Sequence, residues 1–199
     1  MSKSAAKNRN ANVRRNVLDA ARTCFQRYGV ARTRVEDVAA AAGISRPLLY
    51  LHFEGRAGLI EALIDDEIPR FVEANRARIP RDASFAEAFI EGSLAAIEIT
   101  RSNELLADLL DASSITNLTH LWLDRSRPQH ALALGLWKPV FDHGRETGEL
   151  RPELSDDDIL EWLIYVQYIL LERPDLDRAR QRELIETFVL PALTPPAAR

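Results

Sequence analysis

Apolar residues recur at helical spacing along nearly the whole chain, and this spacing limits the fold more than any other feature. Val17, Ala21, Cys24, Phe25 and Tyr28 stand at i, i+4, i+7, i+8 and i+11, which places them on one face of a single helix. The same spacing continues almost to the end of the chain, and no segment alternates apolar and polar residues as a half-buried strand does. The sequence therefore predicts an all-α protein.

Capping and turn residues divide the first part of the chain into three helices. Thr33 and Glu36 have the spacing of a capping box, which predicts the start of a second helix. Gly43 stops that helix, and Ser45 can cap a third. A long helix, then a short helix, a tight turn and another short helix are typical of a helix-turn-helix module, which we expect over residues 10–55.

The rest of the chain predicts a larger helical domain over residues 56–193. Pro69 falls inside its first helix and removes one backbone hydrogen bond, so a bend or break is expected there. Residues 1–9 are expected to form a flexible basic arm, and residues 194–199 a frayed tail. Further helices are expected at residues 84–101, 103–110, 113–127, 128–146, 155–171 and 177–193.

Charge is divided unevenly between the two predicted domains. Residues 1–58 hold eleven Lys and Arg against four Asp and Glu, a net charge of +7, whereas residues 59–199 hold 15 basic and 26 acidic residues, a net charge of −11. A basic module on an acidic body is typical of a small nucleic-acid-binding domain fused to a domain that does not touch nucleic acid; a chance imbalance is the alternative. Lys3, Lys7 and Arg9 either extend the basic surface or belong to a disordered tail.

Several classes of protein are disfavoured by the same sequence. The longest apolar stretch, residues 162–171, has ten residues, fewer than the roughly 18 that suggest a membrane span. The first dozen residues lack the apolar core of a secretory signal, which predicts a cytoplasmic location. The single cysteine, Cys24, cannot form an internal disulfide. Motifs for nucleophilic, phosphate-binding or metal chemistry are missing, so no enzyme, cofactor or metal site is expected.

The segment Gly43–Phe53, with the sequence GISRPLLYLHF, is the most informative motif. Together with Thr33, the preceding VEDVAAAA and the following EGRAGLIEAL, it resembles the DNA-binding region of the TetR family of transcriptional regulators. Arg56 stands where that family usually has Lys, which preserves a cation for phosphate contact. Ala57 and Gly58 replace helix-favouring residues, which predicts a loose start to the fourth helix.

The resemblance implies a DNA-binding transcriptional regulator, with a repressor expected, and assigns residues to DNA contacts. The guanidinium of Arg46, near the start of the recognition helix, can bond O6 and N7 of guanine. Outside such a motif the arginine would be an ordinary solvated side chain, and Leu48 could equally belong to the small core. The expected base contacts are Arg46, Pro47, Leu48, Leu51 and Arg34. The expected phosphate contacts are Thr33, Ser45, Tyr50, His52 and Arg56.

A homodimer on a palindromic operator is expected, because one short recognition helix contacts few bases. The family resemblance places the dimer interface on the last two helices, at residues 155–171 and 177–193. The first of these helices is apolar on nearly all sides, which favours either an interface or a central core helix. The expected interface residues are Trp162, Tyr165, Val166, Ile169, Leu184 and Phe188.

A small hydrophobic effector is expected to bind in the larger domain and to release the operator. Aromatic side chains with a few polar groups are typical of such a pocket, although an aromatic stripe at helical spacing is also typical of a core. An interaction protein that keeps the helix-turn-helix only as a structural element is the alternative to a regulator. The expected pocket residues are Phe89, Asn117, His120, Trp122, Trp137, Phe141 and Tyr165.

Overall fold

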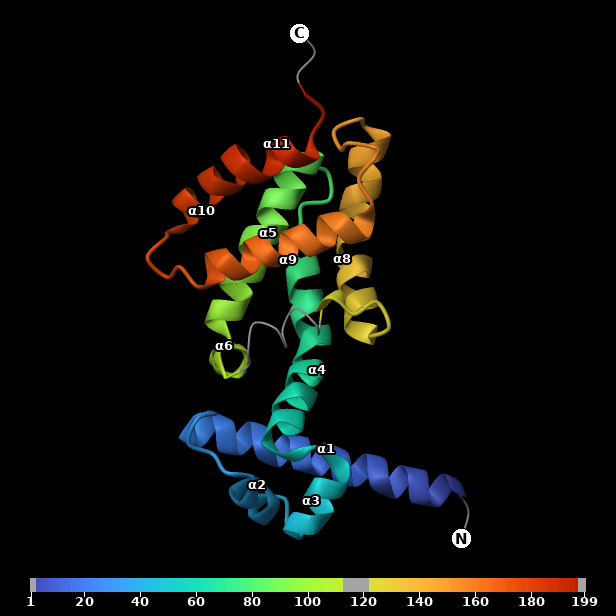
Figure 1. Cartoon of the computed structure of the whole chain (residues 1–199), viewed down its shortest axis with the longest axis vertical. Coiled ribbons are helices and arrows are strands. Elements are labelled where there is room, and N and C mark those ends of the chain that lie inside the picture. The colour runs from blue at the N-terminus through green and yellow to red at the C-terminus, as the bar shows by residue number, and fades with distance from the viewer. Residues whose placement is uncertain (1–2, 113–121, 197–199) are drawn as a thin grey trace. The chain divides into compact units, whose positions relative to one another are not determined.

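The computed structural model describes residues 3–112 and 122–196, and every regular element in these ranges is helical (Figure 1). The predicted all-α class is confirmed. The helices are α1 (Lys3–Tyr28), α2 (Val35–Ala41), α3 (Arg46–His52), α4 (Gly55–Arg76), α5 (Phe85–Ser102), α6 (Glu104–Asp111), α8 (Pro128–Glu146), α9 (Asp156–Leu171), α10 (Arg178–Leu184), the π-helical turn η1 (Ile185–Val189) and α11 (Leu190–Leu193).

Two compact units make up the chain, and the division differs from the boundary expected at residue 55. The first unit runs to Glu67 and also takes in α6, which packs against α1. The second unit holds Ile68–Ser102 and the chain from Trp122 onward. The core of the first unit is made of fully buried apolar side chains from α1 to α4, among them Val17, Ala21, Val38, Leu49, Leu59 and Leu63.

The first helix begins at Lys3, several residues before the start that the apolar spacing predicted. Residues 3–9, expected as a flexible arm, are therefore part of α1. Ala5, Ala6 and Lys7 have high helix propensity, which allows the helix to extend beyond its buried face. Apolar periodicity marks only the part of a helix that packs against something, so it could not locate this start.

The predicted capping box was wrong by one residue. Arg34, not Thr33, is the N-cap of α2, and its backbone N–H donates to Oδ2 of Asp37 at 2.9 Å. Thr33 is buried instead, and its hydroxyl donates to the carbonyl oxygen of Gly29 at 2.9 Å. Gly29, with φ +81°, supplies the left-handed backbone that ends α1, and Thr33 then closes the loop against the end of that helix.

The helix that contains Pro69 does not break. Residues Gly55–Arg76 form one helix, α4, with Pro69 inside it and exposed. Ile68 and Val72 are buried on either side of the proline, and this burial offsets the loss of one backbone hydrogen bond. The division between the two units falls at residue 67, so α4 contributes residues to both.

Aromatic rings form the core of the second unit where α5 packs against α8. Neighbouring ring centroids are 5.7 Å apart for Phe85 and Phe89, 5.7 Å for Phe89 and Trp137, and 6.2 Å for Trp137 and Phe141. Gly144 of α8 allows this close contact, because a Cβ atom there would lie 2.7 Å from Cδ2 of Phe85. Three of the residues expected to line an effector pocket, Phe89, Trp137 and Phe141, are thus buried side by side in this core.

Candidate nucleic-acid interface

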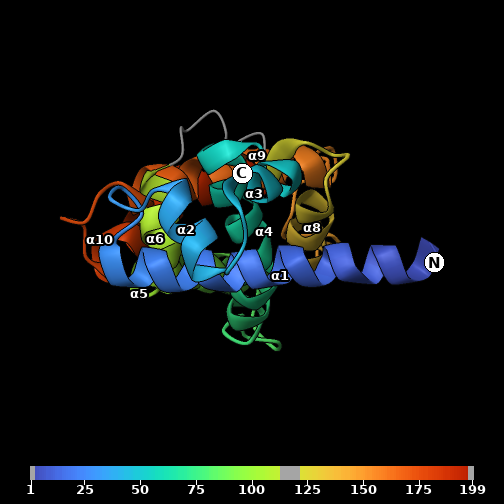
Figure 2. The same cartoon turned by 90° about the horizontal axis from the view of Figure 1, so that it is seen from below.

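The turn between α2 and α3 contains the turn glycine and the serine cap that the sequence predicts. Gly43 adopts φ +66°, which favours glycine, and Ser45 is the N-cap of α3, with its Oγ accepting from the backbone N–H of Leu48 at 3.4 Å. Leu49 and Phe53 are buried and fix one face of α3 against the small core. α2 packs against both α1 and α3 (Figures 1 and 2), so the opposite face of α3 is left exposed.

That exposed face carries the residues expected to contact bases. Arg46 is 58% exposed and Leu51 is 79% exposed, while Pro47 is also exposed and Leu48 is half-buried. Arg34, at the start of α2, is exposed as well. A seven-residue helix with an arginine at its first position and apolar groups beside it offers both hydrogen-bond donors and surface for thymine methyl groups.

The guanidinium group of Arg46 is held by two neighbours. Its Nη1 lies 2.8 Å from Oε1 of Glu36 in the first turn of α2. Its Cζ lies 5.5 Å from the ring centroid of Tyr50, one turn further along α3. A hydrogen bond with Tyr50 and the charge of Glu36 raise the pKa of Arg46 above its already high usual value, so this side chain is always cationic.

The residues expected to contact phosphates are not equally available. Ser45 and Tyr50 are exposed and His52 is half-buried. Thr33, in contrast, is only 3% exposed, and its hydroxyl donates to the carbonyl oxygen of Gly29. Arg56 is half-buried, and its Nη2 donates to the carbonyl oxygen of Val30 at 2.7 Å. This bond ties the start of α4 to the loop after α1, so the loose start expected from Gly58 is countered.

Two residues of α1 that no sequence motif singles out, Asn16 and Arg22, hold the interface in place. Asn16 donates from Nδ2 to the carbonyl oxygen of Ala42 at 2.8 Å, which fixes the C-cap residue of α2 before the turn. Arg22 bridges to Asp66 at 2.6 Å and to Glu67 at 2.7 Å, which anchors α4 on α1. Polar residues on a helix carry no periodic signal for a partner 26 or 45 positions away.

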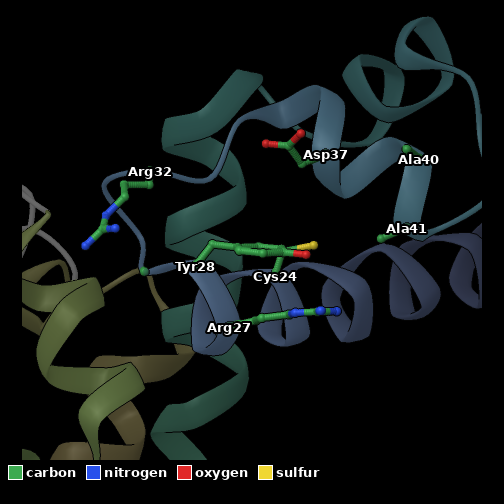
Figure 3. Close-up of a pocket in the computed structure, with 8 residues that line it drawn as sticks. Cys24, Arg27, Tyr28, Arg32, Asp37, Ala40 and Ala41 are labelled. Carbon is green, nitrogen blue, oxygen red and sulfur yellow. The ribbon is translucent and has the colours of Figure 1, made fainter.

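A groove of about 780 Å³ lies between α1 and α2 (Figure 3). Cys24 lies beside it and is 5% exposed, and burial followed by the nearby charge of Asp37 raises the pKa of its thiol. A protonated, buried thiol is a weak nucleophile, which agrees with the packing role expected of this residue. The groove is lined by Cys24, Arg27, Tyr28, Gly29, Arg32, Asp37, Ala40 and Ala41.

The residues expected to contact an effector lie in different environments. Phe89, Trp137 and Phe141 are buried in the aromatic core, and Asn117 and His120 lie outside the described residues. The hydroxyl of Tyr165 donates to Glu161 on its own helix at 3.0 Å. Trp122 is half-buried.

Two buried amide oxygens of the second unit have no hydrogen-bond partner among the described residues. They are Oδ1 of Asn75 in α4, a residue 1% exposed, and Oε1 of Gln129 in α8, a residue 8% exposed. The ring of Trp122 lies 6.1 Å from that of Phe71, one helical turn before Asn75. The carbonyl oxygen of Trp122 lies 2.8 Å from Nδ1 of His130, the residue next to Gln129. The sequence had not indicated either amide, because a buried polar residue cannot be told from an exposed one without its neighbours.

The residues expected at a dimer interface lie on α9, α10 and η1, and three of them are exposed. Trp162 is 48% exposed, Ile169 is 62% exposed and Phe188 is 69% exposed. Tyr165, Val166 and Leu184 are half-buried. Ile159, Leu160 and Leu163 on the other side of α9 are buried, so this helix combines a core face with an apolar outer face.

Within the described ranges, no three His, Cys, Asp or Glu side chains gather as metal ligands do. No helix among the described residues combines the length and the apolar character needed to cross a membrane.

Known proteins resemble the chain in sequence and in fold over most of its length. The family model described as bacterial regulatory proteins of the tetR family matches residues 17–63. An uncharacterized HTH-type transcriptional regulator of Mycobacterium tuberculosis is 27% identical over 182 residues, covering 92% of this chain and 86% of that one. The HTH-type transcriptional repressor KstR2 of Rhodococcus jostii is 26% identical over 146 residues, covering 71% of this chain and 70% of that one.

Among solved structures, the fold is similar to that of SmeT, the repressor of the Stenotrophomonas maltophilia multidrug efflux pump SmeDEF. The TM-score is 0.56 and the sequences are 21% identical, with 92% of this chain and 91% of SmeT covered. A structure of SmeT with triclosan bound is similar to the same degree, with a TM-score of 0.55.

Proposed function

Because this chain belongs to the TetR family of bacterial transcriptional regulators, we propose that it is a repressor that binds a palindromic operator as a homodimer and leaves it when a small hydrophobic molecule binds. The observation that carries the proposal is the exposed face of α3, where Arg46, Pro47 and Leu51 stand on a helix capped by Ser45. Such a face fits the major groove, with Arg46 bonding guanine and the apolar groups meeting thymine methyls.

A homodimer follows from the small size of this surface. α3 has seven residues and can reach only a few base pairs, whereas two such helices about 34–36 Å apart read successive major grooves. The exposed Trp162, Ile169 and Phe188 supply a surface that a second copy can cover. The half-buried Tyr165, Val166 and Leu184 are the other residues proposed to contact the second copy.

The proposed effector site draws its polar groups from Asn75 and Gln129. Unpartnered buried acceptors are uncommon, and a ligand that donates hydrogen bonds would satisfy them. Phe71, one helical turn before Asn75, and Trp122, whose ring contacts that of Phe71, would add aromatic surface to such a site. A neutral, largely apolar molecule with a hydroxyl or amide N–H fits this chemistry, and the structural neighbour SmeT forms a complex with triclosan.

Release of the operator requires that the effector bind one conformation of the protein better than another. α4 is suited to carry this change, because it holds Asn75 near one end and is tied to the helix-turn-helix unit by Arg56 near the other. An effector that binds tightly without changing operator affinity would contradict this part of the proposal.

Selection from a pool of random DNA duplexes, at two salt concentrations, tests the proposal as a whole. Wild-type protein is expected to enrich a palindrome and to bind it less tightly at higher salt. Arg46→Ala is expected to relax the sequence preference at specific positions by about 1–3 kcal/mol. Arg32→Ala removes an exposed arginine outside α2 and α3 and is the matched control, expected to leave the preference unchanged.

Enrichment of no sequence by folded, dimeric protein would favour the interaction-protein alternative. An Arg46→Ala variant with the same sequence preference as wild type would contradict the assignment of α3 as the reading helix.

A further inference from the structure

Three exposed side chains from two helices form a small cluster at the reading face: Glu36, Arg46 and Tyr50. Their side chains are between 45% and 58% exposed, and the ion pair between Glu36 and Arg46 measures 2.8 Å. An ion pair this exposed contributes little to stability. We therefore expect this ion pair to influence which groups Arg46 binds more than it influences the stability of the fold.

The carboxylate of Glu36 occupies Nη1 of Arg46, a donor that a DNA acceptor would also use. A guanine offers two acceptors, O6 and N7, in a geometry that matches the guanidinium fork. A phosphate offers acceptors as well, but it is negatively charged and would approach a second negative charge on Glu36. The carboxylate therefore penalises phosphate capture of Arg46 more than it penalises guanine recognition.

We propose that Glu36 is a specificity-determining residue. On random DNA it keeps Arg46 in the ion pair and away from phosphates, and in the operator a correctly placed guanine displaces it from Arg46. This inference rests on the proposed function. It treats Glu36 as a repulsive element against wrong partners, a common means of raising the ratio of specific to non-specific binding. The stacking of Arg46 over Tyr50 keeps the guanidinium beside α3 while the carboxylate is displaced.

A simpler role for Glu36 would be to stabilise the start of α2 through its charge near the helix N-terminus. Asp37 already fills that role, since it accepts the hydrogen bond from the N-cap residue Arg34. The two roles differ in their consequences: a helix-stabilising charge alters folding, whereas a specificity residue alters the choice of DNA.

The test compares Glu36→Gln with wild type for binding to the selected operator and to a scrambled duplex of the same length, by fluorescence anisotropy over a range of salt. The variant is expected to bind scrambled DNA about 3–10 times more tightly and the operator with little change, so the specificity ratio falls by the same factor. Thermal unfolding is expected to be nearly unchanged, because the side chain is exposed.

Glu54→Gln is the matched control, since it removes one exposed negative charge from the same unit at a residue that is not part of the cluster. An equal gain in non-specific binding by Glu54→Gln would overturn the proposal in favour of a general charge effect. Adding Glu36→Gln to Arg46→Met completes a double-mutant cycle. The effect of Glu36→Gln is expected to shrink without Arg46, and an undiminished effect would also overturn the proposal.

The outcomes separate this inference from the function on which it rests. A wild-type protein that prefers no sequence would contradict the proposed function itself. A selective wild type together with an equally selective Glu36→Gln variant would contradict only the role given to Glu36.

Discussion

Single glycines decide how closely α5 and α8 can pack. Gly144 faces the fully buried ring of Phe85, and a Cβ atom there would lie 2.7 Å from Cδ2 and 2.8 Å from Cγ of that ring. Gly144→Ala is therefore expected to destabilise the protein by about 1–3 kcal/mol through overpacking. Urea denaturation of the purified variant measures this loss.

Gly135 in the same helix is the matched control, because nothing lies within 4 Å of a Cβ atom placed there. Gly135→Ala is expected to stabilise the protein by up to about 1 kcal/mol, from helix propensity alone. Equal effects of the two substitutions would show that α5 and α8 are less tightly packed than described.

The buried oxygen of Asn75 provides a second test at the scale of one residue. Asn75→Leu removes an acceptor that has no partner, so stability is expected to stay the same or rise by about 1 kcal/mol. Asn16→Leu, which removes a donor bonded to Ala42, is expected to cost about 1 kcal/mol and serves as the control. Chemical denaturation of both variants compares them, and an equal loss would mean that Asn75 serves the fold rather than a ligand.

At the scale of elements, α10 is held on α5 by charged side chains. Arg182 pairs with Glu87 at 3.0 Å and also with Glu91 and Glu186, while Arg178 pairs with Glu91 and Glu98. The hydrogen bond from Arg182, aided by its charge, holds the pKa of Glu87 below its usual value of 4.5. Folding therefore gains from the ionised form of Glu87.

The lowered pKa of Glu87 determines how its contribution to the free energy of unfolding changes with pH. The contribution of Glu87 is present above its usual pKa of 4.5 and is lost as the pH falls through the lower folded value. Unfolding free energies of wild type and Arg182→Gln are expected to differ by a constant amount above about pH 5 and to converge at more acidic pH. A difference that persists unchanged to about pH 3 would rule out Glu87 as the source.

Apolar periodicity and turn glycines were sufficient to predict most helices and the helix-turn-helix, because both signals are local. Prediction was weaker wherever a partner distant in sequence decided the outcome. The spacing predicts that Thr33 caps α2, but its hydroxyl instead bonds the carbonyl oxygens of Cys24 and Gly29. Pro69 does not break α4, because its neighbours Ile68 and Val72 are buried.

The last predicted helix is divided instead by a π-helical turn, Ile185–Val189. A π-helical turn changes the angular register of the residues that follow, which spacing rules based on 3.6 residues per turn do not anticipate. Ile185 and Val189 are buried while Phe188 is exposed, so this turn presents a large apolar side chain outward.

At the scale of the whole molecule, substitution of the exposed Phe188 is the most direct test of the homodimer. Phe188→Glu places a charge in the proposed interface and is expected to weaken dimerisation by about 2 kcal/mol or more, which is about thirtyfold. Sedimentation equilibrium measures the change, and operator affinity is expected to fall with it, because a monomer presents one recognition helix.

Leu132→Glu is the control for this experiment, since Leu132 is also exposed and apolar but lies on α8, outside the proposed interface. It is expected to remain dimeric. Dimers of equal strength in wild type and Phe188→Glu would place the interface elsewhere.

The rate at which a reagent labels the buried thiol of Cys24 can report local opening of the protein. It is the chain's only cysteine and lies between α1 and α2, so a thiol reagent can label the native protein at a single place. Because the thiol is 5% exposed, labelling proceeds at the rate at which these helices separate or the chain unfolds. Comparing the labelling rate with and without operator DNA would measure how much the bound duplex slows the local opening of α1 and α2. No engineered cysteine is needed.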